Sequence, residues 1–257
     1  MLIDTHVHLD NEKFEKDYNE MFKRAIDGGV EKFIIPGADP KDLVKAIELS
    51  KNESVFFAVG VHPYHIDDWD ETIFEKVSNP KCVAVGECGL DYFRLPEDKV
   101  EKEKVIEKQK EIFRKQIRIA KKFKKPIIVH IREASEDAKQ ILLEENGDEV
   151  GGVLHCYNAD RTLLDLADSN FYFGIGGVVT FKNGKRLQAV LPDIPREKLL
   201  LETDAPYLTP HPHRGERNEP FYTTFIAEKV AELLNENIET ITNLTTKNSE
   251  EIFKFHE

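Results

Sequence analysis

The chain is poor in cysteine, lacks long apolar runs and has no excess of positive charge. Its three cysteines, Cys82, Cys88 and Cys156, are odd in number and show no Cys-x-x-Cys spacing, which argues against a disulfide framework or a zinc motif. We therefore expect a reduced, cytoplasmic protein. No segment reaches the ~18 apolar residues of a membrane-spanning helix, so no membrane association is expected. The first residues show no signal-peptide pattern.

Acidic residues outnumber basic ones, with 48 Asp and Glu against 36 Lys and Arg and a net charge of −12. This balance argues against a protein that coats duplex nucleic acid, because such binding comes from neutralising phosphates. It leaves room for a local cationic pocket, which bound metal ions would supply. The length of 257 residues fits one large α/β domain over residues 1–257, for which a monomer is plausible.

Strand and helix patterns alternate along the whole chain. Short apolar runs predict strands at 2–9, 32–37, 55–63, 82–92, 126–132, 151–157, 171–179 and 199–208. Helical patterns follow at 14–26, from 39, at 70–77 and 99–124, from 135, from 160 and at 183–190, with final helices from 220 and near 245–248. Eight βα units predict a parallel sheet, and favour a closed (β/α)₈ TIM-like barrel with a C-terminal helical extension over an open sheet.

Polar side chains that can bind metals stand at or near the ends of five of these strands. They are His6, His8, Glu87, His130, His155 and Asp204. The carboxyl ends of parallel strands meet at one mouth of a barrel, so these groups should converge there. Alternation of side chains along a strand directs His6 and His8 to the same face. A single His-x-His can arise by chance, but imidazoles on two further strands make that interpretation much weaker.

Four imidazoles and two carboxylates predict a site for two divalent cations. Such ligands suit zinc or manganese better than magnesium. The simplest distribution places His6, His8 and Asp204 on one ion and His130 and His155 on the other, with Glu87 between them. Two ions in this arrangement would hydrolyse a substrate with an activated water, whose proton Asp204 could accept.

Further polar residues share this mouth. Asp4, Asp91 and Glu202 are expected to orient a ligand imidazole or a nearby cation, although an internal ion pair or hydrogen bond is an equal alternative for Asp4 and Glu202. His62 is a candidate for phosphate contact or for proton donation to the leaving group. Candidate substrate contacts are Arg132, Arg214, Tyr92 and Tyr157, where phosphate binding and base stacking compete with ordinary salt bridges and packing.

The segments LIDTHVHLD, KPIIVHIREAS and LLLETDAPYL, with GVHP and GECGLDY between them, resemble the TatD family of metal-dependent hydrolases. The resemblance implies a (β/α)₈ barrel, a divalent metal centre and deoxyribonuclease activity, often 3′-to-5′ exonucleolytic on single strands or DNA ends. The family's metal positions correspond to His6, His8, Glu87, His130, His155 and Asp204, and no ligand position departs from the pattern. Some relatives remove D-amino acids from tRNA, so tRNA also remains a possible partner.

Two other functions compete with a metal-dependent phosphodiesterase. The first is a carbonyl-centre hydrolase, either amidohydrolase-like or a D-aminoacyl-tRNA deacylase, since its barrel and His-x-His start would look alike. Many dinuclear amidohydrolases join their metals by a carboxylated lysine after the fourth strand, where this chain has Glu87. The second is an inactive barrel that only binds a partner. A missing ligand would indicate it, and none is missing.

Overall fold

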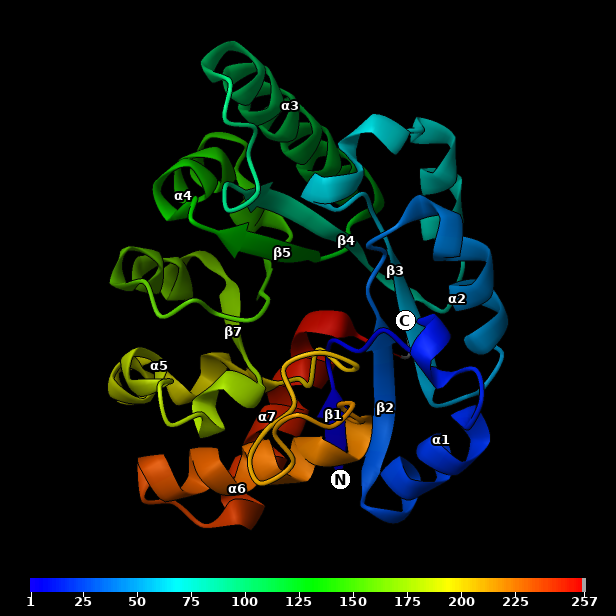
Figure 1. Cartoon of the computed structure of the whole chain (residues 1–257), viewed down its shortest axis with the longest axis vertical. Coiled ribbons are helices and arrows are strands. Elements are labelled where there is room, and N and C mark those ends of the chain that lie inside the picture. The colour runs from blue at the N-terminus through cyan, green and yellow to red at the C-terminus, as the bar shows by residue number, and fades with distance from the viewer. Residues whose placement is uncertain (256–257) are drawn as a thin grey trace.

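Eight parallel strands form one sheet in sequential order, in a computed structural model that describes residues 1–255 (Figure 1). The strands are β1 (Leu2–Asp4), β2 (Val30–Ile35), β3 (Val55–Val59), β4 (Cys82–Asp91), β5 (Ile127–Arg132), β6 (Gly152–Leu154), β7 (Phe171–Ile175) and β8 (Leu199–Leu201). The last strand returns to the first, because the Thr5 N–H donates to the Leu201 carbonyl at 3.1 Å and Val7 forms a parallel bridge with Ala205. The predicted TIM-like (β/α)₈ architecture is confirmed. The last two residues of the predicted domain 1–257 lie outside the described residues.

Helices surround this ring of strands (Figure 1). The α-helices are α1 (Tyr18–Asp27), α2 (Leu43–Leu49), α3 (Lys99–Phe123), α4 (Ser135–Glu144), α5 (Lys185–Val190), α6 (Thr223–Leu234) and α7 (Ile238–Phe253). The 3₁₀ segments are η1 (Glu12–Phe14), η2 (Pro40–Asp42), η3 (Pro63–Asp68), η4 (Glu71–Ser78), η5 (Gly147–Glu149), η6 (Arg161–Ser169), η7 (Gly177–Thr180), η8 (Leu191–Asp193), η9 (Arg196–Lys198) and η10 (Pro220–Tyr222). None of the helices in the described part of the chain is long and apolar enough to cross a membrane.

The longest helix, α3, shows why the sequence folds as it does. The Asp98 carboxylate caps its first turn by accepting from the N–H groups of Val100 and Glu101. Its inner face buries Phe113 and Ile117, together with two glutamines that hydrogen-bond the backbone at the end of β4 and just after β3. Lys124 ends the helix in the left-handed conformation.

The barrel interior is filled by apolar side chains below the mouth. Ile34 of β2, Phe56 of β3 and Tyr172 of β7 belong to this interior cluster. The end of α7 closes it, because Phe253, and then Phe255, pack among the same side chains. In Figure 1 the last turns of α7, in red, lie across the centre of the ring of strands. The predicted C-terminal helical extension therefore seals the end of the barrel opposite the mouth.

Several elements differ from their predicted bounds. Most strands end before the predicted apolar run does. Hydrogen-bonded pairing between neighbouring strands stops, and the remaining apolar residues continue into the loop at the mouth. The segments after β3 and β6 adopt 3₁₀ rather than α-helical structure over much of their length. The last helix begins at Ile238, not near 245–248, because the Asn237 side chain caps it by accepting from the Glu239 N–H.

Candidate metal centre

Glu87 lies at the centre of the barrel mouth, between two sets of imidazoles. It stands in β4 where the pairing with β5 shifts register between Val85 and Cys88. Its Oε2 atom is 3.3 Å from Nε2 of His6. Its Oε1 atom is 2.9 Å from Nδ1 of His130 and 3.9 Å from Nε2 of His155. The two oxygens of one carboxylate therefore face different imidazoles, as a ligand shared between two cations would.

Asp204 completes the side of the site that holds His6 and His8. Its Oδ1 atom is 3.3 Å from Nε2 of His8 and 3.8 Å from Nε2 of His6. The backbone of Asp204 has φ of 55°, a left-handed conformation that few non-glycine residues adopt. Two hydrogen bonds hold it there: its N–H donates to the His6 carbonyl, and its own carbonyl accepts from Tyr207.

The unpartnered nitrogens of His6 test whether this set of residues fits a metal. The ring is buried, yet neither Nδ1 nor Nε2 has a hydrogen-bond partner among the described residues. Buried polar atoms are nearly always partnered in folded proteins. One nitrogen each of His6 and His8 and one oxygen of Glu87 lie within 4.8 Å of one another, and these are ligand types that zinc and manganese prefer. The arrangement fits a divalent cation.

The charges of the carboxylates and imidazoles are strongly coupled. Burial alone would raise the pKa of Glu87, but the surrounding imidazoles, His6 foremost, hold it well below its ordinary value. Burial would lower the pKa of His155, but the carboxylates, Glu202 foremost, raise it to about 10. Asp204 likewise keeps a lowered pKa despite its burial, chiefly through its bond to His8. Glu87 and Asp204 therefore stay anionic and attract positive charge to the mouth.

Two further carboxylates hold the imidazoles of the predicted ligands His130 and His155 in place. Oδ2 of Asp91 lies 3.0 Å from Nε2 of His130. Oε1 of Glu202 lies 3.0 Å from Nδ1 of His155, although that N–H does not point squarely at it. A carboxylate on one ring nitrogen fixes the imidazole and leaves the other nitrogen for a metal. Asp4, in contrast, bonds to the backbone N–H of His6 and to Thr203 rather than to a ring.

The hydrogen bonds of His62 argue against a role as a metal ligand. Its Nδ1 accepts the Tyr64 N–H at 3.1 Å, so the ring proton is on Nε2, which faces Glu87 Oε1 at 3.6 Å. Burial lowers the pKa of His62 to about 3. The ring is therefore a neutral hydrogen-bond donor at neutral pH. Its geometry suits contact with an anionic oxygen better than general-acid catalysis.

Two buried glutamines of α3 position this side of the mouth. The side chain of Gln109 accepts from the Asp91 N–H at 2.9 Å and donates to the Asp91 carbonyl at 3.0 Å. Gln116, seven residues later, makes the same pair of bonds to Val61, next to His62. Neither glutamine is among the site residues that the sequence singled out. Their two-turn spacing on one helix face was the available signal.

The predicted substrate contacts separate into exposed and occupied side chains. Arg132 is exposed, stacks over Phe93 at 3.6 Å from the ring centre, and forms no ion pair among residues 1–255. Tyr157 is buried, with its hydroxyl donating to the Asp160 carbonyl, and the Tyr92 hydroxyl donates to Asp137. Arg214 donates to the Thr209 carbonyl and stacks on Phe181. Of the four, only Arg132 lies free for substrate without breaking an existing bond.

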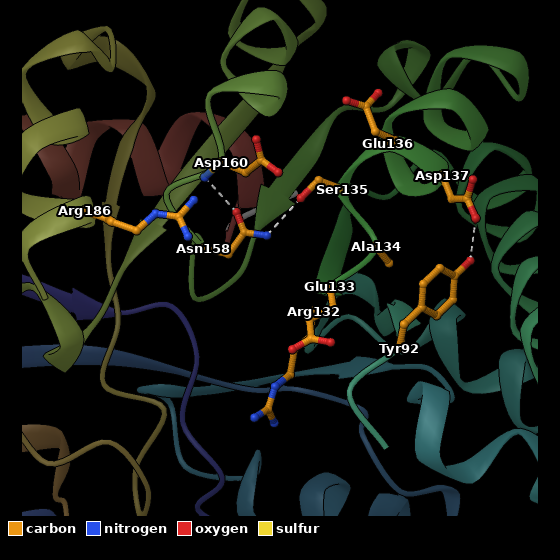
Figure 2. A pocket seen from close by; sticks show the side chains of 10 residues that line it. All are labelled: Tyr92, Arg132, Glu133, Ala134, Ser135, Glu136, Asp137, Asn158, Asp160 and Arg186. Carbon is orange, nitrogen blue, oxygen red and sulfur yellow. Dashed lines mark hydrogen bonds between the residues drawn. The ribbon is translucent and has the colours of Figure 1, made fainter. Parts of the chain in front are cut away.

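Two pockets adjoin at the mouth. The first, of about 490 Å³, is lined by the predicted ligands His130, His155 and Asp204 and also by Tyr207. The second, of about 500 Å³, appears in Figure 2, where Asn158 bonds to Ser135 and to the Asp160 backbone. They share Arg132, Asn158 and Arg186. A substrate that reaches the metal centre has room to extend along this side of the mouth.

Known proteins resemble this chain along its whole length. Residues 3–254 match the family described as TatD related DNase. The chain is 41% identical to an uncharacterized metal-dependent hydrolase, YabD, of Bacillus subtilis, with all of both sequences covered. It is 34% identical to a protein of Shigella flexneri named 3′-5′ ssDNA/RNA exonuclease TatD, with 98% of each covered.

A solved structure shows the same architecture. The TatD homologue YJJV of Escherichia coli superposes with a TM-score of 0.89 at 26% identity, and 98% of each chain is covered. The family resemblance predicted from the sequence is confirmed by these matches. The chain belongs to the TatD family of metal-dependent hydrolases.

Proposed function

We propose that the protein is a deoxyribonuclease that hydrolyses phosphodiester bonds from the 3′ ends of single-stranded DNA. The placement of Glu87 carries the proposal, since its two oxygens face different imidazoles. One divalent ion would be held by His6, His8 and Asp204, and a second by His130 and His155, with Glu87 shared. Zinc, manganese and magnesium are the candidate ions. A relative that is 34% identical and named for this activity supports the substrate.

The residues around the centre supply the remaining chemistry. Divalent ions in such a site polarise a phosphodiester and lower the pKa of an attacking water toward ~7. Asp204 is anionic and placed between His6 and His8, so it can accept the proton of that water. Nε2–H of His62 can donate a hydrogen bond to a phosphate oxygen beside Glu87.

Unpaired arginines near the centre favour an anionic substrate. Arg132 and Arg186 line both pockets, and neither makes an ion pair with a carboxylate in the part of the chain that the structure describes. Most other arginines are paired, as Arg114, Arg118 and Arg217 illustrate. The phosphates of a phosphodiester chain would supply the negatively charged partners that these two arginines lack within the fold.

Cleavage of end-labelled oligonucleotides tests this function. Pure protein loaded with Mg²⁺, Mn²⁺ or Zn²⁺ should shorten 5′-labelled single-stranded DNA stepwise, and Glu87→Ala should lower the rate by more than about 100-fold. Glu228→Ala, on the exposed face of α6, serves as the control. Failure to cleave with any metal, at full metal occupancy, would overturn the proposal.

The same preparation separates phosphoester from carbonyl chemistry. A deacylase would turn over D-aminoacyl-tRNA and leave DNA intact. The residue that β4 places between the imidazoles is a glutamate, where many dinuclear amidohydrolases use a carboxylated lysine, and this favours the phosphodiesterase.

A further inference from the structure

Three exposed aromatic rings stand around the metal centre, and we call them the aromatic rim: Tyr64, Phe93 and Tyr207. These residues are 42%, 51% and 46% exposed, whereas every other aromatic residue in the described part of the chain is buried or half-buried. Single exposed apolar side chains are ordinary. Three aromatic rings around one mouth are a concentration that ordinary surface composition does not explain.

Each rim residue is in contact with the candidate site. The Tyr207 ring lies 5.8 Å from the His8 ring and lines the pocket that contains His155 and Asp204. The Tyr64 ring lies 4.8 Å from the His62 ring. The Phe93 N–H donates to Asp91 at 2.9 Å, and the Phe93 ring stacks on Arg132, which lines both pockets.

These contacts place the rings on two sides of the centre. Tyr207 stands on the side of β1 and β8, beside His8. Tyr64 and Phe93 stand on the side of β3 and β4, where Asp91 contacts His130. A substrate bound at Glu87 would therefore meet an aromatic face in both directions.

A cation accompanies every ring of the rim. The Arg132 guanidinium lies 3.6 Å from the Phe93 ring centre, that of Arg94 lies 5.4 Å from Tyr64, and the Lys13 ammonium lies 5.1 Å from Tyr207. None of the three cations forms an ion pair with a carboxylate among residues 1–255. In a chain with a net charge of −12, three unpaired cations beside three exposed rings form a local, complementary surface for an anionic aromatic polymer.

An aromatic face next to a cation matches the two parts of a nucleotide. A base stacks on the ring, while the phosphate beside it pairs with the cation. Only unpaired bases can present their faces, because a duplex already stacks them internally. Rings that bind by stacking would therefore favour single strands over duplex.

We propose that the Tyr64–Arg94, Phe93–Arg132 and Tyr207–Lys13 pairs bind unpaired nucleotides on both sides of the bond that is cleaved. This inference rests on the proposed function and deepens it, because it assigns the selection of single strands to the aromatic rim. Tyr157 is buried and Tyr92 is half-buried, so the aromatic residues predicted from the sequence expose less of their rings than the rim does.

Binding of oligonucleotides with one base removed tests the stacking directly. Fluorescence anisotropy would measure the Kd of the metal-loaded enzyme for a phosphorothioate oligo-dT, which resists hydrolysis, and for the same oligomer with an abasic site at each position in turn. Phe93→Ala or Tyr207→Ala should weaken binding of the full oligomer about 5- to 100-fold. At one abasic position each substitution should then have no further effect, and Phe93→Trp should restore wild-type affinity.

Matched controls separate stacking from general disruption. Leu143→Ala removes an apolar side chain that is 48% exposed near the end of α4, away from the mouth, and should leave Kd unchanged. Replacing Arg132 with Ala should reduce the dependence of log Kd on log salt by about 0.7. A blunt duplex should bind weakly and show no effect of Phe93→Ala.

The outcomes distinguish this inference from the proposed function. If wild-type protein cleaves DNA but Phe93→Ala and Tyr207→Ala bind like wild type, or lose affinity equally for abasic oligomers, the rim does not stack bases and the inference is wrong. If binding depends on the rim while no metal supports cleavage, the proposed function is wrong and the stacking surface stands.

Discussion

Asp4 shows how one buried carboxyl group supports the metal centre without contributing a ligand. Its Oδ1 atom accepts the N–H groups of Thr203 and His6, and its Oδ2 atom lies 2.6 Å from the Thr203 hydroxyl. It thereby ties the end of β1 to the segment after β8, one residue before Asp204. Burial raises the pKa of Asp4 to about 8, so the group holds a proton at neutral pH.

A neutral amide should therefore replace Asp4 well. We expect Asp4→Asn to change the free energy of unfolding by less than about 1 kcal/mol, because its oxygen accepts the same N–H groups and its amide donates to Thr203. Asp4→Ala should cost about 2–4 kcal/mol, since two buried N–H groups lose their acceptor. Urea denaturation measures both. Equal losses in the two variants would show that the negative charge, not the hydrogen bonding, matters.

For single residues, the sequence predicts which residue types stand near the mouth better than it predicts their hydrogen-bond partners. The six ligands were predicted because each is a metal-binding residue type at or near the end of an apolar run. The role of Tyr157 could not, because its hydroxyl acceptor is a loop carbonyl whose position depends on the fold. The tautomer of His62 likewise depends on the local turn that brings the Tyr64 N–H to Nδ1.

Helix α3 connects the packing of the barrel to the geometry of its mouth. Gln109 pairs with the backbone of Asp91 as a neighbouring strand would, and Asp91 contacts His130. Apolar periodicity predicted this helix and nearly all its bounds. It did not predict which inner-face polar residues bond to strand ends, because that depends on the register of helix against sheet.

Removing the Gln109 amide should affect both stability and metal binding. We expect Gln109→Leu to lower the free energy of unfolding by about 2–4 kcal/mol and to weaken one metal site about 10- to 100-fold. Isothermal titration with Zn²⁺ measures the affinity. Gln140→Leu, on the exposed face of α4, should change neither. Unchanged affinity in a destabilised Gln109→Leu variant would mean that Asp91 is positioned by other contacts.

The loop after β8 is fastened to α1 by a network of four charges. Arg217 contacts both Asp17 and Glu219, and Arg24 makes two hydrogen bonds to Glu219. Burial would raise the pKa of Glu219, but the two arginines, Arg24 foremost, lower it. This loop carries Tyr207, so the network anchors one part of the aromatic rim.

Glu219 should stabilise the fold only where it is ionised. A lowered pKa means that its contribution is complete above the ordinary value of 4.5 and is lost as the pH falls through the lower folded-state value. We expect Glu219→Gln to cost about 1 kcal/mol at pH 7, with the difference from wild type shrinking toward pH 3. Denaturation across this range measures it, with Glu228→Gln as the control. A difference independent of pH would exclude the ionic contribution.

Over the whole molecule, the barrel brings together residues that lie up to 198 positions apart, from His6 to Asp204. The interior below the mouth is apolar and sealed by the end of α7. The charged cluster therefore rests on an apolar core: Glu87 and His130 stand on strands β4 and β5, and Asp204, after β8, is held by its N–H bond to the His6 carbonyl. The sequence predicted this architecture because alternating strands and helices are compatible with few topologies. It did not predict that the end of α7 closes the barrel opposite the mouth, because that depends on where the helix lies in the folded structure.

Metal binding should consequently stabilise the whole fold. A cation that binds only the folded state adds about 2.7 kcal/mol at a hundred times its Kd, and two sites add about twice that. For a chain of this size we expect Tm to rise by roughly 10–20 °C on adding Zn²⁺ or Mn²⁺ to chelator-treated protein. Differential scanning fluorimetry measures the shift, which Glu87→Ala should largely abolish. Asp68→Asn, in the half-exposed group of Asp39, His65 and Asp68 outside the mouth, should keep it in full. A shift that follows Asp68 instead of Glu87 would place the stabilising cation away from the barrel mouth.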